Sequence, residues 1–238
     1  MATRLAVAVG IVLLLGWVPV APAGQASRLI LALGNTAFIN PGAVQATGAE
    51  VSLDPGVPLK NVSVLVLANI PFAALPGTIQ NELVSYLEAG GALLITGGSQ
   101  SFGSGGYRAA TPIIPFEIRS DNDWRFISFR PPVPLQPGHP ILAGVNFSTV
   151  GTINDMNPRP GATEILQSPG GGRAAAITGG SGGGSFLYPL ITELAVGAGR
   201  VIGVAFDLND FAGMRDRDLF VRNTLTYLLT ASRVGLSR

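Results

Sequence analysis

Three residues of the sequence, Ser99, His139 and Asp207, are of the types that together perform acyl transfer. Ser99 follows an apolar run in the segment Gly97-Gly98-Ser99-Gln100-Ser101, which is close to the G-x-S-x-G turn that exposes a nucleophilic serine at a strand end. Ser101 replaces the last glycine of that pattern. His139 is the only histidine and would have to be the base, and Asp207, at the end of another apolar run, could orient it.

The same residues also have a simpler structural interpretation. Glycine and serine suit a chain that turns sharply, with Ser99 or Ser101 satisfying backbone groups. His139 precedes Pro140 in a predicted loop, and for Asp207 we favour a hydrogen-bonding role at a strand end. The sequence therefore leaves a serine hydrolase open as an alternative.

The chain of 238 residues contains no cysteine. This excludes thiol catalysis, disulfides, zinc–thiolate sites, iron–sulfur clusters and a lipoprotein anchor. A calcium loop needs acidic residues at a repeated spacing with a closing carboxylate, and the pairs Asp121/Asp123 and Asp216/Asp218 do not provide it. We expect the first pair in a turn and the second at the start of the last helix, and we predict no metal site.

The sequence predicts neither a cofactor nor a nucleic-acid partner. Its glycine tracts at residues 103–106 and 179–184 match neither of the common phosphate-binding patterns. Lysine and arginine total 15 against 14 aspartate and glutamate, with no basic cluster. The charge footprint of a nucleic-acid-binding surface is therefore absent, as is a polybasic patch for a membrane surface.

The first 26 residues are typical of a secretory signal peptide. Arg4 precedes an apolar run over residues 5–18, and the small-residue segments Ala21-Pro22-Ala23 and Gly24-Gln25-Ala26 follow it. Because the apolar run is shorter than the roughly 20 residues that span a bilayer, we expect cleavage and no membrane span in the mature chain. The predicted protein is exported, periplasmic or extracellular, and begins near residue 24 or 27.

The remaining residues, 27–238, are predicted to form one α/β domain. Residues 62–68 and 92–96 are continuous apolar runs, typical of parallel strands covered on both faces. Between them, residues 78–88 have helical spacing and end at Gly90-Gly91. Together these segments predict a β-α-β unit.

Further elements are expected on both sides of this unit. An amphipathic helix over residues 217–230 closes the chain. Residues 38–47 carry few helix signals, and the proline-rich residues 131–137 favour extended structure. Other strands are expected at residues 28–33, 50–53, 124–129, 163–167, 174–177 and 200–206, and a short one between Pro115 and Ile118.

Several motifs occur in an order that is known from one protein family. They are Glu88-Ala89-Gly90-Gly91, residues 93–98, residues 101–107 (SFGSGGY), Thr111-Pro112, the His139-Pro140-Ile141 motif with Gly144, and Gly197-Ala198-Gly199-Arg200-Val201 followed by Asp207. In this respect the chain resembles the cysteine-less glutamine amidotransferase-like domains of bacterial envelope proteins. The resemblance covers roughly residues 62–230.

The resemblance implies a class I glutamine amidotransferase-like fold, which is a flavodoxin-like three-layer sandwich with a mostly parallel sheet. It also implies a ligand site at the carboxyl ends of the strands, in the glycine-rich loop. Since the amidotransferase reaction of this fold needs a cysteine thiolate activated by histidine, that reaction is excluded. The candidate ligand-binding residues are Gly98, Ser99, Ser101, Phe102, Gly103, Gly105, Gly106 and Tyr107.

The function that we expect is an exported, non-catalytic module. It would bind a partner such as an envelope protein, or a small ligand, at the carboxyl ends of the strands. One alternative is a serine hydrolase that uses Ser99 with His139. Another is a carbohydrate-related envelope protein, because looser relatives of the fold act near sugar metabolism. Within the loop, we expect Phe102 and Tyr107 to pack back onto the sheet.

Overall fold

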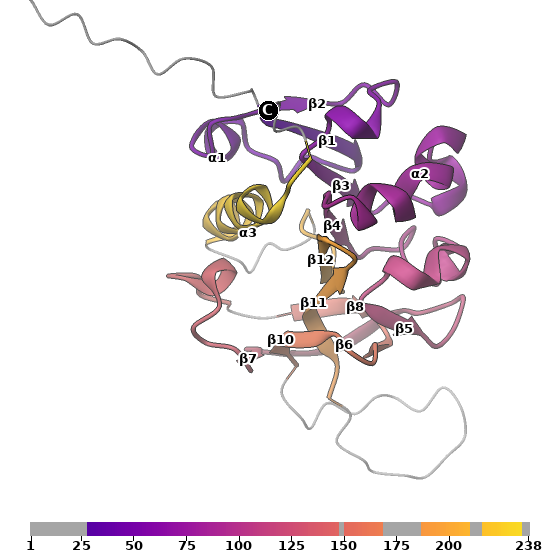
Figure 1. Cartoon of the computed structure of the whole chain (residues 1–238). Helices are drawn as coiled ribbons and strands as arrows, with labels where there is room; N and C mark the ends of the chain where they lie inside the picture. Colours follow the sequence, from indigo (N-terminus) through magenta and orange to yellow (C-terminus); the bar gives the residue numbers. More distant parts are fainter. Residues whose placement is uncertain (1–27, 148–149, 169–186, 210–215, 235–238) are drawn as a thin grey trace, which may run out of the picture.

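The computed structural model describes residues 28–147, 150–168, 187–209 and 216–234. In this part of the chain, helices lie on both faces of an eight-stranded sheet (Figure 1). The predicted signal peptide and the strand predicted at residues 174–177 lie outside the described residues.

The five parallel strands of this sheet lie in the order β2, β1, β3, β4 and β12. β1 pairs with β2 on one side and with β3 on the other, so the strand order reverses between β1 and β3. This is the flavodoxin-like order, in which ligands bind at the switch point beyond the carboxyl ends of the strands. The bounds are β1 (Arg28–Gly34), β2 (Ala49–Ser52), β3 (Val64–Ala68), β4 (Ala92–Thr96) and β12 (Gly199–Val204).

Antiparallel strands complete the sheet on the other side of β12. β11 (Pro189–Val196) forms a hairpin with β12, and β10 (Thr163–Gln167) and β7 (Val133–Pro134) follow it. β11 is the longest described strand, yet no strand was predicted there from the sequence. Its run is interrupted by Thr192 and Glu193, and it becomes a strand because the whole of β12 pairs with it.

Two small antiparallel ladders lie beside the main sheet. β5 (Phe116–Ile118) pairs with β9 (Met156–Pro158), and β6 (Trp124–Arg130) pairs with β8 (Val150–Asn154). The sequence indicated β5 and β6 but not their partners, because β8 and β9 are short and mixed in polarity.

The helices form the two outer layers. α2 (Gly77–Glu88) packs on one face of the sheet, and α1 (Pro41–Gln45) and α3 (Arg217–Ala231) pack on the other (Figure 1). The predicted three-layer α/β sandwich with its mostly parallel sheet is therefore confirmed. No helix in the described segments is long and apolar enough to cross a bilayer.

β3 shows why the parallel strands are apolar along their whole length. Val64, Val66 and Ala68 belong to the core on the α3 face, whereas Leu65 and Leu67 belong to the core on the α2 face. All five side chains are fully buried, as expected for a strand that is covered on both sides.

α1 corrects the expectation that residues 38–47 contain little helix. Asn40 caps the helix, and its Oδ1 accepts a hydrogen bond of 2.9 Å from Gly42 N. Pro41 occupies the first turn, where its missing N–H costs nothing. The start signal was present in the sequence, but the helix is only five residues long, so it has little amphipathic pattern to detect.

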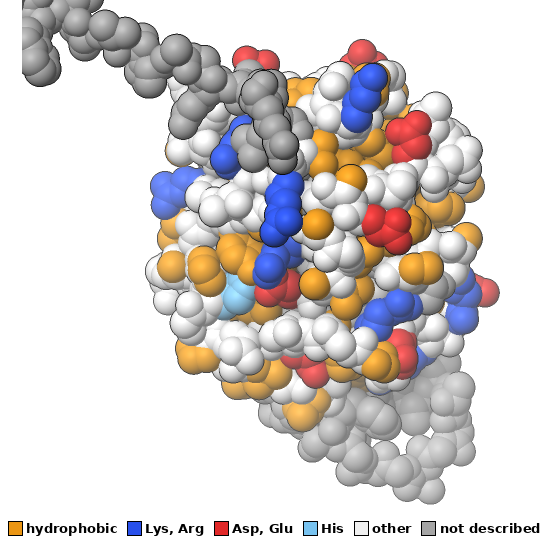
Figure 2. All heavy atoms as spheres, viewed as in Figure 1, with side chains coloured by type: hydrophobic (Ala, Val, Ile, Leu, Met, Phe, Trp, Pro, Cys, Tyr) orange, Lys and Arg blue, Asp and Glu red, His pale blue; other side chains and the backbone are white. Residues whose placement is uncertain are grey.

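Short 3₁₀ turns fill several connections: η1 (Leu59–Asn61), η2 (Phe72–Ala74), η3 (Tyr107–Ile113) and η4 (Pro140–Leu142). On the face of the molecule seen in Figure 2, lysine and arginine side chains lie in small groups among acidic, apolar and uncharged surface. This face carries no broad patch of one charge sign.

Candidate functional site

The carboxyl ends of three neighbouring parallel strands bring polar residues together. Asn69 follows β3, residues 97–101 follow β4, and Asp207 comes soon after β12. Since β4 lies between β3 and β12, Asn69 and Asp207 meet over the end of β4.

Asn69 links the three strand ends. Its Nδ2 donates to Asp207 Oδ2 at 2.8 Å, and its Oδ1 accepts from Gln100 N at 2.9 Å. The backbone of Asn69 has a φ of 41°, in the left-handed region that asparagine tolerates better than most residues. A strained backbone at the end of a strand is typical of functional sites.

Asp207 is buried and holds the neighbouring loops in place. Its Oδ1 accepts from Asn209 N at 2.8 Å and from Asn209 Nδ2 at 3.0 Å. Asn209 Nδ2 also donates to Asn35 O at 2.7 Å, beyond the end of β1. The hydrogen-bonding role that we favoured for Asp207 agrees with these contacts.

Gly98 forms the bend after β4, and a side chain there would not fit. Its φ is 145°, and a Cβ would lie 2.1 Å from Asn69 Cγ. Asn154, at the end of β8, clamps this residue: its Oδ1 accepts from Gly98 N at 2.9 Å and its Nδ2 donates to Gly98 O at 3.2 Å. The bend is thus fixed from both sides by asparagine side chains.

Asp123 anchors the glycine-rich loop from inside the protein. It is fully buried, and its Oδ2 accepts from Gly103 N at 3.0 Å. Its Oδ1 accepts from Ser104 N, Ser104 Oγ and Asn154 Nδ2 at 2.8–3.0 Å. The expectation that Asp121 and Asp123 merely form a turn fits Asp121, which is exposed and pairs with Arg108, but not Asp123.

Ser99 is exposed at the apex of the bend. Ser101 N donates to Gly98 O at 3.2 Å, so that Ser99 and Gln100 occupy the centre of a turn. Ser101 itself is buried, and its Oγ donates to Thr96 O at 2.7 Å. Turns rather than a helix follow the bend, and the next helical segment is η3. Ser99 therefore lacks the helix N-terminus that follows a nucleophile elbow.

Phe102 and Tyr107 pack the loop onto the sheet, as expected. Both are fully buried, and their rings contact Phe116 and Phe72 at centroid distances of 5.3 Å and 5.4 Å. Burial raises the pKa of Tyr107 above its usual range. Phe102 has a φ of 48°, which is rare for a bulky residue.

The other glycines of the predicted ligand set differ in burial. Gly103 and Gly105 are buried against backbone atoms, whereas Gly106 is exposed, with open space where a Cβ would lie. The side chains that a ligand could touch directly in this loop are therefore few, and Ser99 and Gln100 are the exposed ones beside the bend.

His139 lies on the α3 face of the sheet, in a different setting from Ser99. Its Nε2 is 3.2 Å from Glu193 Oε2, its Nδ1 accepts from Ile141 N at 3.4 Å, and its ring centroid is 4.9 Å from that of Tyr227. Both ring nitrogens thus have partners. Among the described residues, no contact joins His139 to Ser99, so the structure connects Asp207 with the bend after β4 but does not bring His139 to it.

Glu193 is the centre of a half-buried polar cluster around His139. Tyr227 OH donates to Glu193 Oε1 at 2.7 Å, and Arg200 Nη1 donates to the same oxygen and to Tyr227 OH. Burial favours the neutral acid, but the hydrogen bonds from His139, Tyr227 and Arg200 outweigh it and lower the pKa of Glu193 to about 2. The cluster ties η4 and α3 to the sheet.

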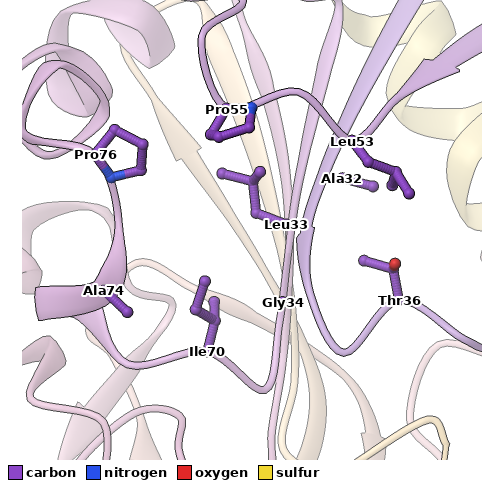
Figure 3. Close-up of a pocket in the computed structure, with 9 residues that line it drawn as sticks. All are labelled: Ala32, Leu33, Gly34, Thr36, Leu53, Pro55, Ile70, Ala74 and Pro76. Atoms are coloured by element: carbon purple, nitrogen blue, oxygen red, sulfur yellow. The ribbon is translucent and has the colours of Figure 1, made fainter.

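A cavity of about 270 Å³ opens at the carboxyl ends of β1, β2 and β3 (Figure 3). Gly34 is required here because a Cβ would lie 2.1 Å from Ala68 O and 2.8 Å from Ile70 Cβ. Apart from Thr36, every side chain of the lining is apolar. The lining residues are Ala32, Leu33, Gly34, Thr36, Leu53, Pro55, Ile70, Ala74 and Pro76.

Sequence reasoning missed Asn69, Asp123 and Asn154 as residues that shape the site. Asn69 carried a usable signal, because a polar residue that directly follows a buried parallel strand lies at the ligand edge. Asn154 carried none, since it ends a strand that was not predicted. The cavity also escaped prediction, because its walls are ordinary apolar residues from three separate segments.

The sequence matches no known protein family and no curated protein, but solved structures share the fold. A cytoplasmic protein from Salmonella typhimurium aligns with 14% identity and a TM-score of 0.63, over 87% of this chain and 100% of that one. A ThuA-like protein from Bacteroides uniformis aligns with 10% identity and a TM-score of 0.56, over 93% and 98%. A GMP synthase-like protein from Thermoplasma acidophilum aligns with 9% identity and a TM-score of 0.50, over 87% and 96%.

The last two proteins have class I glutamine amidotransferase-like folds. This chain has a class I glutamine amidotransferase-like fold. At these identities the similarity extends to the fold alone, and the narrower resemblance to domains of envelope proteins stays a prediction.

Proposed function

We propose that this chain is an exported, non-catalytic module that binds a small apolar group in the cavity at the carboxyl ends of β1, β2 and β3. The position of the cavity carries the proposal. It lies where the strand order reverses between β1 and β3, which is where open α/β sheets of this order bind their ligands.

The chemistry of the cavity wall supports a neutral, apolar occupant. Among the described residues, no ionisable side chain lines it, and Thr36 is the one lining residue with a polar side chain. Beside it, the hydrogen bonds of Asn209 to Asn35 O and to Asp207 connect the end of β1 to the network over β4. Such a preformed cavity with a single polar group suits binding.

A non-catalytic role is supported by the absence of cysteine from the sequence and by the contacts of His139 within the described residues. The chain has no cysteine, and the contacts of His139 are with Glu193, Ile141 and Tyr227. The serine-hydrolase alternative is tested with a serine-reactive fluorophosphonate on the purified protein, and we expect no label. Label that both Ser99→Ala and His139→Ala abolish would establish the alternative instead.

Binding is tested with N-phenylnaphthylamine, an uncharged fluorophore that brightens in apolar sites. Leu53→Asp places a charge on the cavity wall, and Ile70→Trp fills the cavity; each should weaken binding by about tenfold or more. Leu135→Asp is the matched control, because Leu135 is a partly exposed leucine beyond β7. Equal weakening by the control, or no binding to the unaltered protein, would contradict the proposal.

Export is supported by the signal-like first 26 residues and has its own test. The amino-terminal sequence of the protein recovered from outside the cytoplasm should begin near residue 24 or 27. Recovery only from the cytoplasm, with residue 1 retained, would contradict export. The carbohydrate-related alternative stays a prediction from the sequence.

A further inference from the structure

We infer that the occupant of the cavity is an apolar side chain of a partner protein, whose extended segment adds to the sheet beside β2. This inference rests on the proposed binding role of the cavity and names the kind of partner. It follows from the edge of β2 that has no strand partner among the described residues, from the apolar side chains exposed at this edge, and from its charge.

β2 is the edge strand of the main sheet, and its described partner is β1 on one side only. An edge strand presents backbone N–H and C=O groups that can pair with another chain. Addition of an extended peptide to such an edge is a common mode of recognition, in which backbone pairing provides affinity and side-chain pockets provide specificity.

The edge exposes apolar side chains that lead to the cavity. Val51 is 37% exposed and Leu53 is 64% exposed. Val51 lies in β2, and Leu53 directly follows the end of the strand. Leu53 is also a wall of the cavity (Figure 3), so a segment that follows β2 towards its carboxyl end arrives at the cavity mouth.

The charges of this edge indicate a basic partner segment. Glu50 and Asp54 are both exposed, and neither forms an ion pair within the described residues; Asp54 Oδ1 instead accepts from Gly56 N. Proteins often protect an edge strand with charged residues, and Glu50 alone would fit that role. The exposed Val51 and Leu53 do not fit a protective role, because a protected edge exposes little apolar surface.

The partner segment is therefore an extended strand with a short run of apolar residues, one of which fills the cavity, and with lysine or arginine near its ends. A segment of this kind pairs with the outer edge of β2, fills the apolar cavity and neutralises the two carboxylates together. A free small molecule would use the cavity only.

The probe is the fluorescein-labelled peptide Lys-Val-Leu-Val-Lys with blocked ends, and its binding to the full protein is measured by fluorescence anisotropy. Glu50→Lys combined with Asp54→Lys should weaken binding about tenfold or more, as should Leu53→Asp. Glu82→Lys, which makes one such carboxylate-to-lysine change at an exposed position on α2, should leave it unchanged.

Backbone pairing is tested with two N-methylated versions of the peptide. One is methylated at the central leucine and the other at the two valines, so that they block opposite edges of the added strand. We expect one version to lose binding by about tenfold or more and the other to keep it.

If both versions bind as well as the parent peptide, or if the peptide fails to bind while N-phenylnaphthylamine binds, strand addition is overturned and the binding role of the cavity stands. If neither probe binds, both proposals fail. Circular dichroism of each variant shows whether it is folded, and Val51→Lys provides a second variant of the edge that leaves the cavity wall unchanged.

Discussion

Asn69 Nδ2 donates a 2.8 Å hydrogen bond to Asp207 Oδ2 over the end of β4. The two residues are 138 positions apart in the chain, and they connect the carboxyl ends of β3 and β12. Asn69 also accepts from the backbone of Gln100, so one side chain sets the position of the bend after β4 relative to both neighbouring strands.

Loss of this contact should destabilise the protein without changing its fold. Asp207→Ala removes the acceptor of at least three hydrogen bonds in a buried site and should lower the free energy of unfolding by about 3 kcal/mol. Asn69→Gly keeps the left-handed backbone and should cost about 1–2 kcal/mol. In urea denaturation the double variant should be more stable than the sum of the two losses implies, because the two residues share a bond. Strict additivity would show that the Asn69–Asp207 bond contributes nothing.

Gly98 should not tolerate a methyl group. Gly98→Ala places a Cβ 2.1 Å from Asn69 Cγ at a φ of 145°, so that either Asn69 or the bend must move, at a cost of about 1–3 kcal/mol or more. Gly138→Ala is the control, because nothing lies within 4 Å of its Cβ and its φ is not positive. Thermal unfolding should show a large decrease for the first variant and almost none for the second. Similar melting temperatures would mean that the bend is not held by Asn69.

Asp123 should contribute far more to the stability of the protein than Asp121. Asp123→Ala leaves Gly103 N, Ser104 N and Asn154 Nδ2 without their buried acceptor, and should cost about 3 kcal/mol or more. Asp121→Ala removes an exposed ion pair with Arg108 and should cost less than about 1 kcal/mol. Hydrogen exchange would report the same difference locally, as faster exchange of the Gly103 and Ser104 amides in Asp123→Ala. Equal effects of the two variants would contradict a buried anchor.

Glu193 should make the protein sensitive to acid. Because the hydrogen bonds that it accepts lower its pKa in the folded state from 4.5 to about 2, its ionised form stabilises the fold fully above about pH 5. That contribution, a few kcal/mol at most, should be lost as the pH falls from about 4.5 towards 2. Glu193→Gln should flatten the dependence of the unfolding free energy on pH in this window and lower stability at neutral pH. An unchanged pH profile in this variant would assign the acid sensitivity to other carboxyl groups.

The parallel half of the sheet and helices α2 and α3 could be predicted from the sequence. β3 and β4 are continuous apolar runs with a helix of clear periodicity between them, and a strand that is buried on both faces must be apolar along its length. α3 was equally clear, because one of its faces packs on the sheet. The hairpin partner β11 and the ladder strands β8 and β9 were not, since their pairing depends on distant segments rather than on their own pattern.

The candidate site likewise has some features that the sequence predicted and others that only the structure revealed. The sequence by itself determined that the bend after β4 is rich in glycine and serine and that no thiol is present. It also indicated that Asp207 follows a strand and lies at the same edge of the sheet. Only the tertiary structure decided that His139 joins Glu193 on the α3 face, that Asp123 and Asn154 hold the loop from inside, and that nine ordinary residues enclose a cavity. The physical reason is that local pattern determines burial and secondary structure, whereas the meeting of side chains far apart in the chain depends on how the strands are ordered and on which loops lie over their ends.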